Sequence, residues 1–348
     1  MRLEKHPADE MTPIERKKSI EQGKEIDRVP CVPCMGEIKC QISDMNIRDF
    51  WHNSHKMVEA EIRTFNRLGH DRLMIGPNSY GISDVLGAEV IYPKHGLPYI
   101  KKPILDTYEQ LNSIEAIEVT TNKRIKPFLE AAQILGEMAQ FIVPVEASVG
   151  GPFTIAANLR GVESLLRDLR KDPENVHRLL RIVTDSQKSC MKEATKHGLG
   201  IALADPVSSP DLIGAKYYQE FAFPYMKELT DYACSLGHKA SLHMCGKTYR
   251  IWKYFRQYEV NEVSLDNMID LKRAVEELSD AIPIAGNVPP VDVVMNGSKE
   301  DIVHSVQECI QIGSQAKKGY VLTTGCEIPL HTEIEKIDWL MEAVRNYS

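Results

Sequence analysis

Eight short apolar runs, rich in β-branched residues, recur along the 348-residue chain and alternate with longer amphipathic stretches. The apolar runs cover residues 29–35, 71–75, 141–147, 200–204, 239–244, 260–265, 282–285 and 319–323. The amphipathic stretches have helical periodicity and cover residues 57–68, 125–139, 162–169, 173–197, 217–236, 271–278, 299–314 and 334–344. Alternation of strand and helix predicts an α/β fold with a parallel sheet, either closed or doubly wound and open. The count of eight favours the closed form, a (β/α)8 TIM barrel.

Neither a linker nor an internal repeat divides the chain, so we expect a single barrel domain over residues 1–348. Residues 1–28 have the pattern of a helical cap that extends the barrel at its N-terminal side. Residues 90–105 (VIYPKHGLPYIKKPIL) alternate in polarity and contain three prolines. This pattern predicts a hairpin-like insertion.

The balance of charge excludes several classes of partner. Lys and Arg number 42 against 49 Asp and Glu, a net charge of −7, which argues against a nucleic-acid-binding protein. No apolar run approaches the ~18–20 residues needed to cross a bilayer, and the first residues lack the apolar core of a signal peptide. We therefore expect a cytoplasmic protein with no membrane partner. Its eight scattered cysteines do not form a disulfide framework, so each is a packing residue, a metal ligand or a nucleophile.

Chemically active side chains follow the predicted strands at their carboxyl ends, where barrels of this kind place their working residues. His243 and Cys245 are two positions apart on an extended segment, so both point to the same side. Cys326 follows the eighth run, and an imidazole with two thiolates selects zinc while leaving one position open. Asp266, after the sixth run, is a candidate for that position. On spacing alone, packing cysteines remain an equal alternative.

Motifs across most of the chain resemble the uroporphyrinogen decarboxylase superfamily. They lie at residues 150–155 (GGPFTI), 172–174 (DPE) with His177, 218–225 (YQEFAFPY), 243–246 (HMCG), 286–289 (GNVP) and 325–329 (GCEIP). The resemblance implies a (β/α)8 barrel. In the decarboxylase itself, arginines on the loop after the first strand hold the carboxylates of the tetrapyrrole. That loop here is 34–39 (CMGEIK), which presents Glu37 and no arginine, and this argues against decarboxylation.

A second branch of the superfamily, the zinc-dependent corrinoid methyltransferases similar to methylcobalamin:coenzyme M methyltransferase, carries a His-x-Cys motif and a distant Cys. His243, Cys245 and Cys326 match these ligands one for one. The resemblance implies that Zn²⁺ activates a small acceptor and that a methyl group moves between this acceptor and a corrinoid (cobalamin). A thiol such as coenzyme M is the favoured acceptor, because zinc coordination deprotonates a thiol near neutral pH.

Four further residues are assigned roles within this hypothesis. Asp266 holds the resting zinc or acts as a base; otherwise it is a hydrogen-bond partner of His243. Glu146 and Asp205 orient the substrate or the corrinoid, or else cap the helices that follow them. Asn287 contacts the bound ligand, or else it shapes the turn after Gly286.

The sequence leaves the partners partly open. It contains no DxHxxG-type corrinoid-binding motif, so the methyl carrier arrives on a separate corrinoid protein or as free cobalamin, docking on an exposed rim. Another thiol, a tetrahydrofolate or a methylated growth substrate can replace coenzyme M, and the direction of transfer is not determined. The alternatives are a tetrapyrrole decarboxylase and a non-catalytic tetrapyrrole-binding protein.

Overall fold

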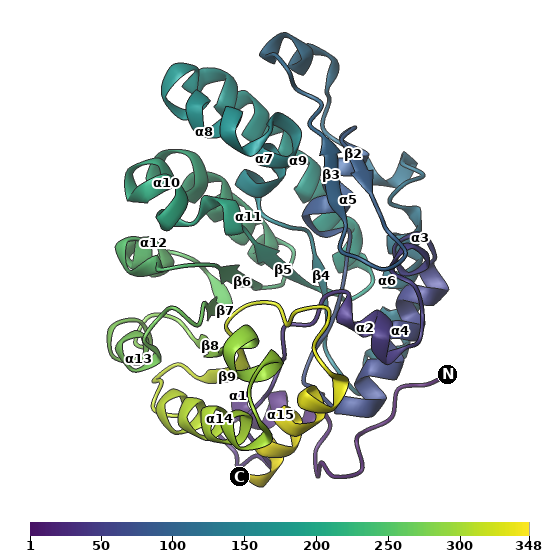
Figure 1. The fold of residues 1–348 in the computed structure, drawn as a ribbon, viewed down its shortest axis with the longest axis vertical. Coiled ribbons are helices and arrows are strands. Elements are labelled where there is room, and N and C mark those ends of the chain that lie inside the picture. The colour runs from purple at the N-terminus through teal and green to yellow at the C-terminus, as the bar shows by residue number, and fades with distance from the viewer. Residues whose placement is uncertain (348) are drawn as a thin grey trace.

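The structure, a computed structural model, describes residues 1–347. Seven parallel strands form one curved sheet with the order β1-β4-β5-β6-β7-β8-β9. They are β1 (Leu73–Ile75), β4 (Val145–Ser148), β5 (Gly200–Ala204), β6 (Ala240–Met244), β7 (Val260–Leu265), β8 (Ile284–Val288) and β9 (Tyr320–Thr324). Figure 1 shows the strands at the centre of the molecule with the helices around them.

The eighth barrel position is filled by a segment too irregular to be a strand. The Cys31 carbonyl accepts a hydrogen bond from the backbone N–H of Asp71 (2.8 Å), just before β1, and Cys31 forms an isolated parallel bridge with Leu322 of β9. The expected strand over 29–35 is therefore wrong in length, although the segment closes the barrel at the expected place. Pro30 and Pro33 explain the difference, because neither has an N–H to donate to a strand ladder.

Helices connect the strands and cover the outside of the sheet. They are α1 (Pro13–Glu21), α2 (Ile38–Ile42), α3 (Ile47–His52), α4 (Ser54–Leu68), α5 (Asn78–Val85), α6 (Lys126–Ala139), α7 (Pro152–Arg160), α8 (Val162–Lys171), α9 (Pro173–Lys196), α10 (Pro210–Tyr217), α11 (Phe223–Ser235), α12 (Trp252–Phe255), α13 (Leu271–Leu278), α14 (Lys299–Gly313) and α15 (Ile334–Asn346). Short 3-10 segments are η1 (Tyr108–Ser113), η2 (Val119–Thr121), η3 (Pro206–Ser208) and η5 (Thr248–Ile251), and π turns are η4 (Tyr218–Ala222) and η6 (Pro290–Met295). Within residues 1–347, none of these helices is long and apolar enough to span a bilayer.

Two further expected elements differ from the structure. The helix expected over 217–236 starts as the π turn η4 and becomes regular only in α11, which has Pro224 in its first turn. The strand expected over 141–147 begins only at Val145, because Pro144 precedes it and Phe141 is 76% exposed. The strands β2 (Glu89–Ile91) and β3 (Tyr99–Lys102) form an antiparallel hairpin apart from the main sheet (Figure 1).

Small residues on the inner face of the sheet leave the barrel hollow. The residues that face inward from the strands include Ser148, Ala202, Ala204, Ser241, Ser264, Ala285 and Thr323. Barrels of this type usually fill that space with Val, Ile and Leu. Here a cavity of about 520 Å³ extends through the interior.

A buried ion-pair network ties the N-terminal extension to the barrel. Arg28 donates to Asp9 (3.0 Å) and to Asp71 (2.6 Å), and the fully buried Arg16 donates to Asp71 as well. Asp9 also accepts a hydrogen bond from Arg345 of α15 (2.8 Å), so both ends of the chain meet at one carboxylate. Breaking such a pair leaves an uncompensated buried charge and costs far more than breaking a surface pair.

Asp9→Asn is expected to lower the free energy of unfolding by about 2–4 kcal/mol at pH 7. Burial alone would raise the pKa of Asp9, but hydrogen bonds from Arg28 and Arg345 outweigh it and lower that pKa to about 2. A carboxylate with a depressed folded pKa stabilises the fold above its unfolded pKa of ~3.9, and this contribution disappears as the pH falls toward 2. The difference between wild type and variant in urea unfolding should therefore shrink as the pH falls below about 4.

Asp231→Asn is the matched control, since its partner Lys227 lies four residues earlier on the exposed face of α11. This variant should have nearly the same free energy of unfolding as the wild type, both at pH 7 and below about pH 4. An Asp9→Asn variant with wild-type stability at pH 7 would show that the network does not hold the extension in place.

Candidate metal centre

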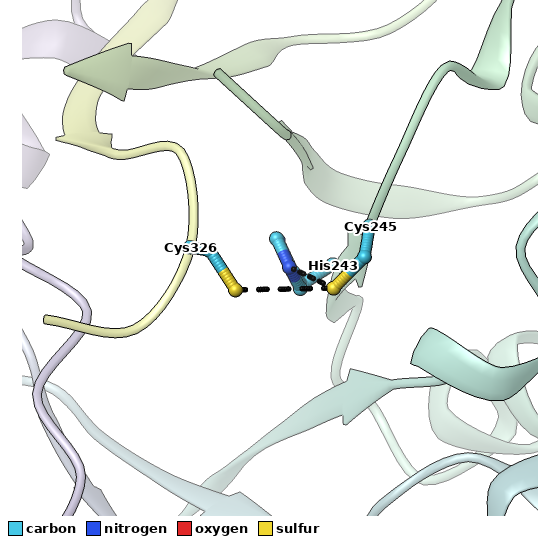
Figure 2. Close-up of side chains that lie close together, drawn as sticks. All are labelled: His243, Cys245 and Cys326. Atoms are coloured by element: carbon cyan, nitrogen blue, oxygen red, sulfur yellow. Dashed lines mark hydrogen bonds between the residues drawn. The ribbon is translucent and has the colours of Figure 1, made fainter. Parts of the chain in front are cut away.

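Three side chains converge at the carboxyl end of the barrel. His243 belongs to β6, Cys245 follows that strand directly, and Cys326 follows β9. His243 Nε2 lies 3.2 Å from Cys245 Sγ, and Cys245 Sγ lies 3.9 Å from Cys326 Sγ. One ligand atom from each residue lies within 4.8 Å of the others, and Figure 2 shows the side chains pointing toward one another.

The alternation of β6 aims these side chains. Ser241, His243 and Cys245 are each two residues apart and all line the cavity, as the period of a strand requires. On the neighbouring strand β7, Ser264 lies opposite His243, and its hydroxyl is 3.0 Å from His243 Nδ1. This contact fixes the ring so that Nε2 faces the two sulfurs.

The donor set fits a zinc ion in both spacing and charge. Around a tetrahedral zinc with Zn–S bonds of about 2.3 Å, two sulfurs lie roughly 3.7 Å apart, close to the separation between Cys245 and Cys326. Hydrogen bonds from Cys245 and His243 lower the pKa of Cys326 to about 4, whereas the bond to Cys326 raises the pKa of Cys245. The two sulfurs therefore lie close enough to interact directly, at the place that a soft cation would take.

Asp266 lies beside this centre, but its carboxylate is already bonded. One oxygen accepts from the backbone N–H of Gly246 (2.8 Å) and the other from that of Met268 (2.8 Å). The carboxylate thus joins the loop after β6 to the loop after β7. The residue that orients His243 is Ser264, where we expected Asp266 as one possibility.

Glu146 lies deeper in the barrel than the expected strand end. Ser241 donates a hydrogen bond to it (2.7 Å), and Arg72 approaches it at 3.3 Å while bonding Glu262 at 2.6 Å. Because Ser241 precedes His243 by two strand residues, this cluster lies roughly 6–7 Å below the three donors. Burial raises the pKa of Glu146 to about 7, with Glu262 adding to the rise and Arg72 opposing it. Glu146 therefore lies behind the cavity wall, bonded to two residues that line it, Ser241 and Arg72, and neither contact is a helix cap.

The carboxylate of Asp205 holds the first turn of α7. It accepts hydrogen bonds from the backbone N–H groups of Phe153 (3.2 Å) and Thr154 (2.7 Å), and it is completely buried. Burial raises the pKa of Asp205 to about 6. A Cβ on Gly151 would lie 2.2 Å from this side chain, which explains the glycine at the start of the helix. Asp205 thus caps a helix, but this helix is α7, which precedes it in the chain, and not the helix that follows, as we expected for one of its two roles.

Asn287 has a comparable structural contact. It lies within β8, and its Nδ2 donates to the carbonyl oxygens of Asp266 (3.0 Å) and Ile269 (2.8 Å). Both donor hydrogens of the amide are therefore used to hold the loop after β7. The alternative role expected for Asn287, shaping a turn after Gly286, is wrong, because Gly286 and Asn287 both lie within β8 and the amide holds the loop after β7.

Two carboxylates line the cavity beside the three donors, although sequence reasoning assigned them no binding role. Glu327 follows Cys326 directly, and Glu37 lies on the loop after the closing segment, with its Oε1 accepting from Trp51 Nε1 (3.1 Å). A Cβ on Gly36 would lie 1.9 Å from Glu327 Oε1, so the glycine leaves room for this side chain. Burial and the nearby Glu37 raise the pKa of Glu327 to about 8. The sequence feature that could have indicated these two residues is an acidic residue after each of two neighbouring barrel positions, the closing segment and β9.

Comparison with known proteins identifies the family and the fold of the chain. A model of the uroporphyrinogen decarboxylase family (URO-D) matches residues 12–347. A methylcobamide:CoM methyltransferase of Methanosarcina acetivorans is 27% identical, covering 97% of this chain and 99% of that protein. A methylated-thiol–coenzyme M methyltransferase of Methanosarcina mazei is 24% identical, covering 94% and 88%. The solved structure of a methyltransferase from Methanosarcina mazei has a TM-score of 0.85 at 22% identity, covering 97% and 99% of the two chains, which confirms the predicted fold.

Ser264→Ala is expected to weaken zinc binding by about 10- to 100-fold, because the His243 ring loses the partner that fixes its orientation. The affinity can be measured by competition with a chromogenic chelator. Ser241→Ala is the matched control, since its hydroxyl bonds Glu146 and makes no contact with His243. Equal zinc affinity in the two variants would contradict a role for Ser264 in orienting the imidazole.

Proposed function

Because the chain belongs to the uroporphyrinogen decarboxylase family, we propose that this barrel is a methyltransferase that moves a methyl group between a corrinoid and a thiol. The resemblance that the sequence motifs predict is confirmed by the family match. The relatives named above are methyltransferases that use a methylcobamide or a methylated thiol together with coenzyme M. The convergence of His243, Cys245 and Cys326 is the observation that carries the proposal.

The chain contributes charge and orientation at this centre. A bound zinc would supply Lewis acidity, which keeps an acceptor thiol deprotonated near neutral pH although a free thiol has a pKa of ~8.5. Cys245 and Cys326 bring two negative charges, which offset the charge of the cation and leave electron density on the acceptor sulfur. Ser264 holds His243 in the orientation that directs Nε2 toward the sulfurs. The three donors are only half-buried and lie on the wall of the cavity, so a thiol and a methyl donor can both reach them.

The same cavity disfavours decarboxylation of a tetrapyrrole. A substrate with several carboxylates needs unpaired cations, but Arg72 is bonded to Glu262 and Lys39 is bonded to Glu61. Glu37 and Glu327, which also line the cavity, offer such a substrate no positive partner. A non-catalytic tetrapyrrole-binding role meets the same objection.

We place the corrinoid partner over the carboxyl end of the barrel. Three large apolar side chains are exposed in segments that follow strand ends: Leu212 (49%), Met268 (51%) and Val291 (47%). They lie in segments that follow β5, β7 and β8, as the donors Cys245 and Cys326 follow β6 and β9. Exposed apolar residues at the working end of a barrel are candidates for a protein-binding face. We propose that a separate corrinoid protein docks there, in the cytoplasm, where the cysteines stay reduced.

The decisive experiment measures zinc and turnover in the same preparations. Purified protein should contain about one zinc per chain and should demethylate methylcobalamin when a thiol is added, as followed by the change in cobalamin absorbance. Cys326→Ala should lose the metal and reduce turnover by about 100-fold or more, because one ligand is removed.

Cys234→Ala is the matched control, because Cys234 lies on α11 with its thiol directed to the Glu259 carbonyl. It should retain both zinc and turnover. Full metal content and activity in Cys326→Ala would rule out the proposed ligand set.

A further inference from the structure

Some of the charged side chains that line the cavity form ion pairs with each other, and others do not. They are Glu37, Lys39, Glu61, Arg72, Glu262 and Glu327. Carboxylates outnumber cations in this set, so the question is which of them remain available to a ligand.

Both cations are already bonded to the protein. Arg72 donates to Glu262 through both terminal nitrogens (2.6 and 3.2 Å), and Glu146 lies 3.3 Å from it. Lys39 donates to Glu61 and to the Met74 carbonyl (2.9 Å). An anionic group entering the cavity would therefore find each cation neutralised by a carboxylate. It would lose hydration without gaining an ion pair of its own.

Glu37 and Glu327, in contrast, have no cation from the described part of the chain bonded to them. Neither forms an ion pair with a Lys or Arg of the described residues 1–347. Glu327 follows the donor Cys326 in the chain and lines the same cavity, so its carboxylate is available to a ligand whose sulfur lies between the donors. The two carboxylates belong to loops that meet in the cavity, since Glu37 follows Gly36, whose Cβ position lies 1.9 Å from Glu327 Oε1, so an ammonium can lie between them.

Aromatic side chains complete the wall on this side. Trp51 donates its indole N–H to Glu37, and Tyr80 lines the same cavity. Aromatic rings together with carboxylates are a common environment for organic cations, because the ring face is negative.

Resting on the proposed methyl transfer, we propose that the acceptor is an aminothiol, a thiol whose ammonium group is a short carbon chain away from the sulfur and is bound by Glu37 and Glu327. The thiol proton leaves to solvent, and the thiolate sulfur attacks the methyl carbon of a methylcorrinoid. The S–CH3 bond forms as the Co–C bond breaks, and both electrons of that bond stay on cobalt, which goes from Co(III) to Co(I). The products are an S-methyl thioether with its ammonium intact and a Co(I) corrinoid.

The test uses three thiols that differ only in the group at the far carbon: 2-aminoethanethiol, 2-mercaptoethanol and 2-mercaptoethanesulfonate. Zinc-loaded enzyme is given methylcobalamin and each thiol, and kcat/KM is compared among them. Glu37→Gln and Glu327→Gln remove the charges while keeping the side-chain size, and Gln at position 37 can still accept from Trp51. Glu335→Gln, an exposed change on α15, is the control. Calorimetric binding of each thiol gives a readout that does not depend on turnover.

We expect 2-aminoethanethiol to be preferred over the sulfonate by about 10- to 100-fold in wild type and in Glu335→Gln. Glu37→Gln and Glu327→Gln should each reduce this preference by about tenfold or more. The kcat/KM for the neutral thiol, 2-mercaptoethanol, should change much less in both variants. A wild-type preference for the sulfonate, or an unchanged ratio in both cavity variants, would overturn the aminothiol assignment alone. If zinc-loaded enzyme transfers methyl to none of the three thiols, the proposed function fails, and the aminothiol assignment fails with it.

Discussion

The closure of the barrel depends on Asp71. Its carboxylate accepts from Arg16, from Arg28 (2.6 Å) and from the backbone N–H of Cys31 (2.7 Å), while its own N–H donates to the Cys31 carbonyl (2.8 Å). The segment around Cys31 has too few N–H groups to hold itself between β9 and β1 by a regular ladder. Side-chain charge from the N-terminal extension replaces the missing strand bonds. The extension is therefore part of what closes the sheet.

Closure determines what the cavity can contain. It places the loop after the Cys31 segment beside the loop after β9, two regions separated by nearly the whole chain. Gly36 and Glu327 meet there so closely that a single Cβ would displace the carboxylate. The approach of Gly36 to Glu327 also places the next residue, Glu37, in the cavity wall that contains Cys326. The position of the carboxylate pair beside Cys326 is thus a consequence of joining the first and last barrel positions.

Much of this architecture could be predicted from the sequence, because strand alternation has a fixed period. His243 and Cys245 share a face for that reason, and the cavity-facing Ser264 is likewise placed by its period on β7. What could not be predicted is which polar side chains the chain itself would use. Asp205 and Asp266 have the chemistry of ligands and stand at strand ends, yet backbone N–H groups of distant residues bond both carboxylates. Those donors are set by loop geometry, which no local pattern encodes.

The hollow interior connects fold to chemistry. A barrel packed with Val, Ile and Leu would gain hydrophobic stability and have no space for a substrate. This barrel has Ala and Ser at many inward positions, and the space they leave ends on the buried Arg72 cluster. Because Glu146 and Glu262 neutralise that arginine, the floor offers no free positive charge. The charge of a ligand is therefore selected by Glu37 and Glu327, which line the cavity beside the sulfurs. When the ligand's sulfur occupies the donor site, the other end of the ligand would lie next to these two carboxylates.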